Sequence, residues 1–199
     1  MRKAVGDDWP LMIDVAGNYN HQQALMVGKV LEELSYHWYE EPLRDFDLHG
    51  YRMLADKLDI PICGVEVVGG SMYTTPEYIT TRAVDIVRAD VSFKGGIGPL
   101  KKIAGLCEAF GMNLEVHTNA NTLIDAANLH VIASIPNTEY YEQLVPEALF
   151  TLAGVEKIHI DREGFAHVPQ GPGIGARIDW ELVERYKVWV KGLPGGLSF

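Results

Sequence analysis

The sequence has little of three features that would assign it to a specialised class of protein. Its two cysteines, Cys63 and Cys107, lie in apolar stretches without a C-x-x-C pair, so we expect buried reduced thiols instead of a disulfide framework. No apolar run approaches the roughly 20 residues of a membrane span. The first ten residues, MRKAVGDDWP, lack the apolar core of a signal peptide. We therefore predict a soluble, cytoplasmic protein with no membrane partner.

Positive charge is also scarce. No run of Lys or Arg is longer than two residues, and the formal net charge is −10. This balance argues against a protein that binds the phosphates of a nucleic acid. The hydrophobic fraction of 47% and the charged fraction of 22% are ordinary for a globular chain, and 199 residues are enough for one well-buried domain.

Short apolar runs alternate with longer amphipathic stretches along the chain, which predicts parallel β/α units. The expected strands are Leu11–Val15, Trp38–Glu41, Ile60–Glu66, Ile86–Asp90, Asn113–His117 and a weaker one at Ile132–Pro136. The expected helices are residues 20–36, 50–58, 76–84, 97–110, 121–131 and 179–191. In the stretch 97–110 one apolar face is predicted from Ile97, Leu100, Ile103, Ala104 and either Cys107 or Leu106.

Two architectures fit this alternation: an open doubly wound sheet and a closed (β/α) barrel. The first strand is followed by Ala16-Gly17-Asn18-Tyr19, which is not the Gly-rich turn of a nucleotide-binding sheet. After residue 154 the pattern changes to a hairpin, Lys157–Asp161 with Phe165–Val168. We predict an α/β fold: a partial (β/α) barrel of about six parallel units, within one domain 1–199 that has a C-terminal extension at 155–199.

Three acidic residues end the first three expected strands. Asp14, Glu40 and Glu66 follow one another at intervals of 26 residues, one β/α unit each. The C-terminal ends of successive strands meet at one rim of a barrel, where active sites form. Three carboxylates close together raise one another's pKa unless a cation lies between them. The spacing therefore predicts a site for a hard divalent cation, Mg²⁺ by preference and Mn²⁺ as the alternative.

Two further strand ends carry residues suited to proton transfer. Asp90 ends the fourth expected strand and His117 ends the fifth. A hydrogen bond from one ring nitrogen of His117 to Asp90 would fix the tautomer and make the other nitrogen more basic. We therefore expect Asp90 and His117 to act as a general acid–base pair that faces the metal site.

These segments together resemble the barrel domain of the enolase superfamily, and its mandelate racemase subgroup in particular. The segments are LMIDVAGNY (11–19), HWYEEPL (37–43), PICGVE (61–66), DIVRADVSFKGGIGPLKKIA (85–104), LEVHTNAN (114–121), PNTEYYE (136–142) and HVPQGPGIGARID (167–179). The resemblance implies metal ligands at Asp14, Glu40 and Glu66 and an acid–base dyad of Asp90 and His117. It also implies that Glu142, with Glu139 as the competitor, meets the substrate carboxylate from the end of the last strand.

The resemblance also has gaps. The family places a Lys-x-Lys motif on a strand before the first ligand, and the ten residues before Leu11 contain none. We therefore expect the first two β/α units and the capping domain to be absent. Val65 stands where the family usually has Gly before the third ligand. A partial barrel leaves strand edges unpaired, which favours a homo-oligomer.

The reaction that the resemblance implies is removal of the proton α to a carboxylate, with the metal stabilising the resulting enolate. A sugar-acid dehydratase or a racemase/epimerase acting on a small carboxylate substrate is the main hypothesis. The alternative is a catalytically inactive remnant or assembly module that keeps the metal site. A third hypothesis is an open-sheet binding protein whose carboxylates are unrelated.

Overall fold

A computed structural model describes residues 1–118, 122–147, 150 and 153–187 of the 199. The strands are β1 Met12–Asp14, β2 Trp38–Glu40, β3 Ile62–Gly64, β4 Ile86–Ala89 and β5 Asn113–Val116. The helices are α1 Arg2–Val5, α2 His21–Glu33, α3 Leu48–Lys57, η1 Ser71–Tyr73, α4 Thr75–Thr80, α5 Val91–Lys94, α6 Ile97–Ala109, α7 Thr122–Ile132 and α8 Trp180–Tyr186. The five stronger predicted strands and the six predicted helices are therefore present, with boundaries shifted by a few residues. The predicted helical residues 121 and 188–191 lie outside the described part of the chain.

The five strands form one parallel sheet in the order β1-β2-β3-β4-β5. Each strand pairs with the next one along the chain, as in a barrel, whereas a doubly wound sheet reverses its order at a switch point. Within the described residues the sheet is not closed, and β1 and β5 are its edges. The predicted α/β fold with parallel, barrel-type units is confirmed.

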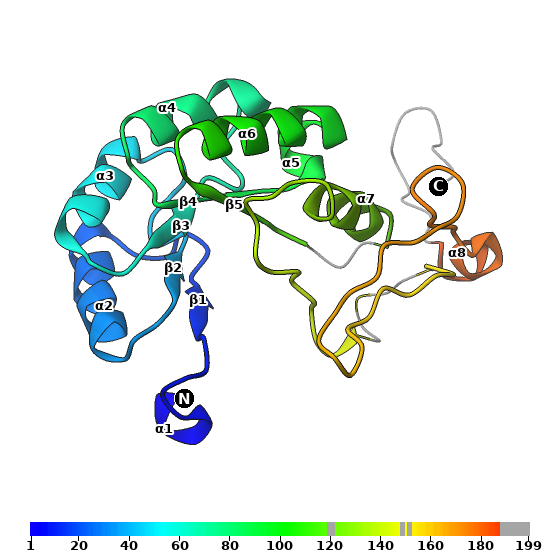
Figure 1. The fold of residues 1–199 in the computed structure, drawn as a ribbon, viewed down its shortest axis with the longest axis horizontal. Coiled ribbons are helices and arrows are strands. Elements are labelled where there is room, and N and C mark those ends of the chain that lie inside the picture. The colour runs from blue at the N-terminus through cyan, green and yellow to red at the C-terminus, as the bar shows by residue number, and fades with distance from the viewer. Residues whose placement is uncertain (119–121, 148–149, 151–152, 188–199) are drawn as a thin grey trace. The chain divides into compact units, whose positions relative to one another are not determined.

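Helices α2, α3, α4 and α6 lie along one side of this sheet (Figure 1). On α6 the buried residues are Leu100, Ile103, Ala104 and Cys107, so Cys107 and not Leu106 completes the apolar face. The predicted membership of Ile97 in this face is wrong, because its side chain is 39% exposed at the first turn of the helix. Both cysteines are buried and unpaired, as predicted.

Side-chain caps explain why several helices begin where they do. Asn20 and Gln23 form a reciprocal capping box at the start of α2. Asp47 accepts a hydrogen bond from the Gly50 N–H at the start of α3, 2.9 Å long. Asp90 caps α5 in the same way through the Phe93 N–H, 2.8 Å long. The aspartate predicted as a catalytic residue therefore also fixes the start of a helix.

The weaker strand predicted at Ile132–Pro136 is wrong. Ile132 ends α7, and turn hydrogen bonds follow from Ser134 N–H to Val131 O (2.9 Å) and from Ile135 N–H to Ile132 O (3.4 Å). A short apolar run does not by itself distinguish a strand from a helix, and here its first residue is the end of α7. The segment after it still joins the sheet by one bond, Leu114 N–H to Asn137 O, 2.8 Å long.

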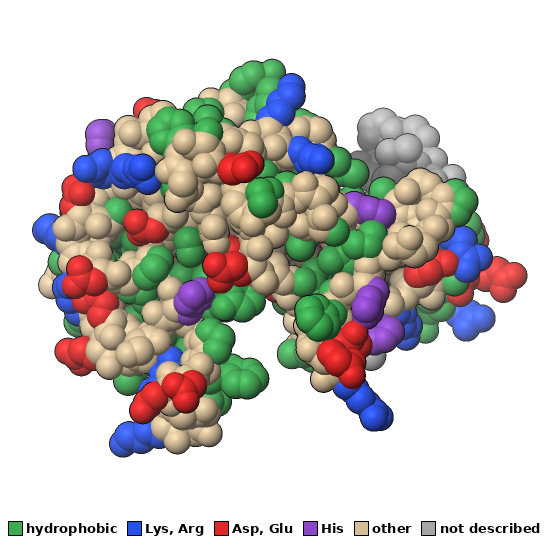
Figure 2. Space-filling view, viewed as in Figure 1, with side chains coloured by type: hydrophobic (Ala, Val, Ile, Leu, Met, Phe, Trp, Pro, Cys, Tyr) green, Lys and Arg blue, Asp and Glu red, His purple; other side chains and the backbone are tan. Residues whose placement is uncertain are grey.

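The chain divides into two compact units: residues 1–117 with 131–142, and residues 118–130 with 143–199. The single domain 1–199 stays a prediction. In the second unit the predicted hairpin is confirmed as one antiparallel bridge, Ile160 with Ala166, and Asp179 caps α8. The described helices include none long and apolar enough to cross a bilayer. On the face seen in Figure 2 acidic and basic side chains are interspersed.

Candidate metal and acid–base site

The first two predicted ligands lie side by side on neighbouring strands. Asp14 and Glu40 are register partners in the β1–β2 pair, each the last residue of its strand. Asp14 is exposed, and its Oδ1 accepts a hydrogen bond from the Ala16 N–H, 2.7 Å long. Glu40 is buried, and its Oε2 accepts a hydrogen bond from the indole N–H of Trp38, 3.0 Å long. The strand ends therefore bring the two carboxyl groups to one rim.

Glu66 lies just beyond β3, and the residue before it has a left-handed backbone conformation. β3 ends at Gly64, and Val65 has a φ of 77°. Glu66 is buried, and burial together with the neighbouring charge of Glu40 raises its pKa to about 7, although His117 and Arg88 act in the opposite direction. The effect of burial on the Glu66 carboxyl group therefore outweighs that of the two nearby basic side chains.

Arg88, on β4, lies among the acidic residues. Its Nε is 2.7 Å from Oε1 of Glu40 and 4.0 Å from Oε2 of Glu66, and its Nη2 donates to Oε2 of Glu142 over 2.7 Å. Burial alone would lower the pKa of the guanidinium, but Glu40 and the other nearby acids outweigh it and raise that pKa. Arg88 is thus a permanent cation held by three carboxylates.

The predicted acid–base pair is in place geometrically. Nδ1 of His117 is 2.9 Å from Oδ2 of Asp90 and 3.5 Å from Oε1 of Glu66. Burial opposes protonation of His117, but the hydrogen bond with Asp90 and the charge of Glu66 outweigh it and raise the pKa of the ring. The pKa of Asp90 is lowered despite its burial, because it accepts hydrogen bonds from His117, Phe93 and Ser92.

Glu142 does not lie on a strand, contrary to the prediction, because the segment around it forms no ladder with β5. It nevertheless reaches the site through its ion pair with Arg88. The competing residue, Glu139, accepts a hydrogen bond from Asn113 Nδ2 over 3.2 Å at the opposite end of β5. Of the two glutamates, Glu142 is therefore the one placed beside Arg88.

The donor set fits a divalent cation in its chemistry. Asp14, Glu40 and Glu66 offer hard oxygen donors. The pKa of Glu40 is raised like that of Glu66, mainly by burial, with the charge of Asp14 adding to the shift and Arg88 opposing it. A bound cation would favour the ionised form of both groups. The described residues include no three His, Cys, Asp or Glu side chains already placed to hold an ion. Glu40 and Glu66 lie beside Arg88, and Glu66 also lies beside His117. Asp14 instead accepts a hydrogen bond from the Ala16 N–H.

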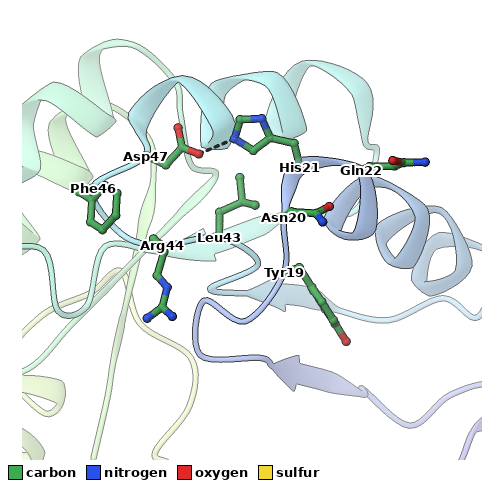
Figure 3. A pocket seen from close by; sticks show the side chains of 8 residues that line it. All are labelled: Tyr19, Asn20, His21, Gln22, Leu43, Arg44, Phe46 and Asp47. Carbon is green, nitrogen blue, oxygen red and sulfur yellow. Dashed lines mark hydrogen bonds and ion pairs between the residues drawn. The ribbon is translucent and has the colours of Figure 1, made fainter.

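A separate pocket of about 460 Å³ opens near the ends of β1 and β2. Figure 3 shows His21 and Asp47 pointing toward one another in it. Its lining comes from the segments that follow these two strands: Tyr19, Asn20, His21, Gln22, Leu43, Arg44, Phe46 and Asp47. None of the predicted ligands or acid–base residues lines this pocket, so the chemistry is assigned to the carboxylate cluster.

The sequence analysis missed several buried polar residues of this site. Arg88 lies two residues before Asp90, and Glu115 two residues before His117, so each pair shares one face of its strand. Applying this period of two along β4 and β5 would have found both residues. Lys94, Glu41 and Asp45 are also buried, and no spacing rule points to them.

The comparisons with known proteins show which enzymes the chain resembles. An arabinonate dehydratase of Saccharolobus solfataricus is 34% identical over 94% of this chain and 50% of its own length. An L-talarate/galactarate dehydratase of Salmonella typhimurium is 30% identical over 96% of this chain and 44% of its own length. The chain spans about half the length of the curated relatives it matches.

Solved structures give the same result. The D-glucarate dehydratase of Agrobacterium tumefaciens, complexed with magnesium, is 40% identical, with a TM-score of 0.81 over 94% of this chain and 49% of its own. A racemase of Streptomyces coelicolor with bound magnesium is 27% identical, with a TM-score of 0.83 over 94% of this chain and 49% of its own. The family model described as "Enolase C-terminal domain-like" matches residues 1–182. The chain therefore belongs to the enolase C-terminal domain-like family, as the sequence analysis predicted.

Proposed function

We propose that this chain provides the metal ligands and the acid–base pair of an enzyme that removes the proton α to the carboxylate of a sugar acid. Dehydration or racemisation/epimerisation then follows. The observation that carries the proposal is the position of His117, whose Nδ1 lies within 3.5 Å of both Asp90 and Glu66. A histidine beside two carboxylates, at a rim of buried acidic residues, is a candidate for proton transfer.

His117 is the residue assigned to proton transfer. Its Nδ1 faces Asp90, so in the neutral ring the proton is held at Nδ1 and Nε2 is the basic atom. Nε2 accepts the α proton of the substrate. In a dehydration the same atom returns a proton to the departing hydroxyl group, which leaves as water.

Asp14, Glu40 and Glu66 are the residues that would hold Mg²⁺, with Mn²⁺ as the alternative. A bound divalent cation supplies positive charge where negative charge develops on the substrate carboxylate. Arg88 holds Glu40 and Glu142 in place through its two 2.7 Å contacts, and Glu142 is assigned to the substrate carboxylate. This division of roles follows the implied family pattern residue by residue.

The names of the relatives support a sugar acid as the substrate class. They include an arabinonate dehydratase, an L-talarate/galactarate dehydratase and a D-galactarolactone cycloisomerase. Each name refers to a polyhydroxylated acid or its lactone. We propose a substrate of this class, a homo-oligomer as the working form, and no nucleic-acid partner.

The test combines calorimetric titration of Mg²⁺ with exchange of the α proton in D₂O across a panel of sugar acids, followed by NMR. Wild type is expected to bind the metal and exchange the proton. His117→Asn should keep metal binding and lose exchange, whereas the exposed pair His167–Asp161 provides a matched control in His167→Asn. Exchange that persists in His117→Asn would exclude the role of His117.

A second function is supported by a specific observation: Arg88 already pairs with Glu40 and Glu142. This arrangement favours a module that keeps the acidic rim for assembly and turns nothing over. Metal binding without proton exchange by any sugar acid would favour this module. Asp14→Ala, Glu40→Ala and Glu66→Ala variants that bind metal as wild type does would instead show that the carboxylates are unrelated.

A further inference from the structure

Lys94 is a buried cation outside the set of residues assigned above. It is the last residue of α5, four positions after Asp90, and its side chain is fully buried. Lysine is among the residues least often buried without a partner. Burial lowers the pKa of its ammonium group to about 8, although the charges of Asp45 and Glu66 act in the opposite direction. Burying an ammonium group is unfavourable unless it is hydrogen-bonded or paired, so its contacts indicate its role.

The ammonium group of Lys94 binds the turn that carries Glu66. Its Nζ donates to the carbonyl oxygens of Val65, over 2.7 Å, and of Val68, over 3.2 Å. Asp45 binds the same turn, because its Oδ2 accepts a hydrogen bond from the Val67 N–H, 2.7 Å long. The turn 65–68 is thus fixed at several backbone positions by two buried side chains.

Val65 is the residue in this turn that needs such support. Its φ of 77° lies in the left-handed region, where a β-branched residue is a genuine outlier. Its side chain is fully buried and cannot relax toward solvent. Backbone conformations of this kind persist only when the surrounding contacts hold them in place. Of the two hydrogen bonds that the Lys94 ammonium group donates to this turn, the shorter ends on the carbonyl oxygen of this same residue.

We propose that Lys94 is a positioning residue that holds Val65 in its left-handed conformation and thereby places the Glu66 carboxylate beside His117. The contact also affects the position of Glu66, because the Val65 carbonyl group that Lys94 binds belongs to the peptide bond between Val65 and Glu66. Since Asp90, which follows β4, caps the start of α5, the contact also connects the end of β3 to the end of β4. Any effect of this contact on metal binding rests on the proposed function, in which Glu66 is a metal ligand. The contact between Lys94 and Val65 does not depend on that function.

A double-mutant cycle on the 199-residue chain without added metal tests the contact. Glycine adopts a positive φ without a steric cost, so Val65→Gly removes the need for the clamp. Lys94→Met should increase amide hydrogen exchange at residues 66–68 by about tenfold in the wild-type background and by less than about threefold in the Val65→Gly background. Val84→Gly is the matched control, since Val84 is equally buried and lacks a positive φ, and there the tenfold effect should remain.

An equal effect of Lys94→Met in the wild-type and Val65→Gly backgrounds would overturn the proposal, because Lys94 would then act as a buried cation without regard to Val65. If Lys94→Met alone does not fold, the comparison moves to the double variant. Folding of the double variant with Val65→Gly supports the clamp, and its failure to fold contradicts it.

Calorimetric titration of the same variants with Mg²⁺ separates this proposal from the proposed function. Lys94→Met should weaken Mg²⁺ binding about tenfold, and should do so less in the Val65→Gly background. A positive exchange cycle in a chain that binds no Mg²⁺ would leave the clamp standing and remove the metal role of Glu66. Unchanged Mg²⁺ affinity in Lys94→Met, in a chain that binds the metal, would contradict the positioning of Glu66.

Discussion

Nε of Arg88 lies 2.7 Å from Oε1 of Glu40, and both side chains are buried. The two residues come from β4 and β2, strands that are separated by β3. Their contact therefore crosses the face of the sheet on which the acidic rim lies, and it brings the negative charge of Glu40 to a fixed position. Removing one partner of a buried ion pair leaves the other charge buried without compensation, so the free energy of unfolding is sensitive to substitution of either residue.

Removing the cation of this pair should strongly destabilise the chain. In Arg88→Met the buried carboxylate of Glu40 loses its partner, so the free energy of unfolding should fall by about 3–5 kcal/mol. Lys29→Met is the control, since Lys29 pairs with Glu32 at the surface and should change stability by less than about 1 kcal/mol. Urea unfolding measures both. A loss in Arg88→Met no greater than that of the control would show that the pair contributes little.

Asp90→Asn should lower the pKa of His117. The amide oxygen can still cap α5, but the negative charge that stabilises the protonated ring is gone. Since the folded-state pKa of His117 is raised, its stabilisation is present below the unfolded pKa, about 6.5, and is lost as pH rises through the folded value. The variant should therefore lose more stability at pH 5.5 than at pH 8.

NMR titration of the His117 ring protons measures this shift. Ser92→Ala, which removes one hydrogen bond to Asp90 Oδ1 and no charge, is the control and should change the His117 pKa little. An unchanged pKa in Asp90→Asn would mean that Glu66 and not Asp90 supports the protonated ring.

The strand ends could be predicted from the sequence because two regularities coincide there. Hydrophobic runs mark the strands, and the intervals of 26 residues place Asp14, Glu40 and Glu66 one unit apart. Both depend on local pattern and on the geometry of parallel β/α units. The same reasoning failed at Ile132–Pro136, where a short apolar run carries no period that separates strand from helix.

The interior partners of the site could not be predicted in the same way. The reach of Arg88 to Glu40 depends on side-chain length and strand order, and neither is visible in the spacing of acidic residues. Neither the burial of Lys94 nor the positive φ of Val65 could be expected from the sequence, since Lys94 is a charged residue and Val65 is β-branched. The structure brings His117 beside Asp90 and Glu66, as the spacing suggested, whereas the roles of the predicted site residues stay predictions.

The stability of the metal-free chain should fall as pH rises from about 5 to 8. Burial raises the pKa of Glu41 to about 9, with the charges of Asp45 and Glu66 adding to the shift, and the pKa of Glu66 is raised to about 7. Over this window the folded chain binds more protons than the unfolded chain, so each unit of pH rise favours unfolding. Above pH 8 the lowered pKa of Lys94 acts in the opposite direction.

Glu41→Gln should remove much of this dependence. The amide keeps the shape of the protonated carboxyl group beside Asp45, so the variant should match wild type near pH 5. At pH 8 it should be more stable by up to about 4 kcal/mol, which is what wild type loses over this window if the folded-state pKa is about 9. Urea unfolding at pH 5, 6.5 and 8 gives the two curves. Parallel curves for variant and wild type would show that Glu41 is already ionised in the folded chain.

Glu115 should prove to be the residue that holds the segment carrying Glu142. Its buried carboxylate accepts hydrogen bonds from the N–H groups of Glu139, 3.1 Å long, and Tyr140, 3.2 Å long. Glu115→Ala leaves both N–H groups without this acceptor, so we expect a loss of about 2–3 kcal/mol in the free energy of unfolding and faster amide exchange at both positions.

Glu115→Gln keeps one acceptor oxygen and should lose less than about 1.5 kcal/mol, since burial already raises the pKa of Glu115 toward a neutral group. Glu108→Ala, on the exposed side of α6, controls for the loss of a surface charge, and similar losses in the Ala and Gln variants of Glu115 would show that its charge and not its hydrogen bonding matters.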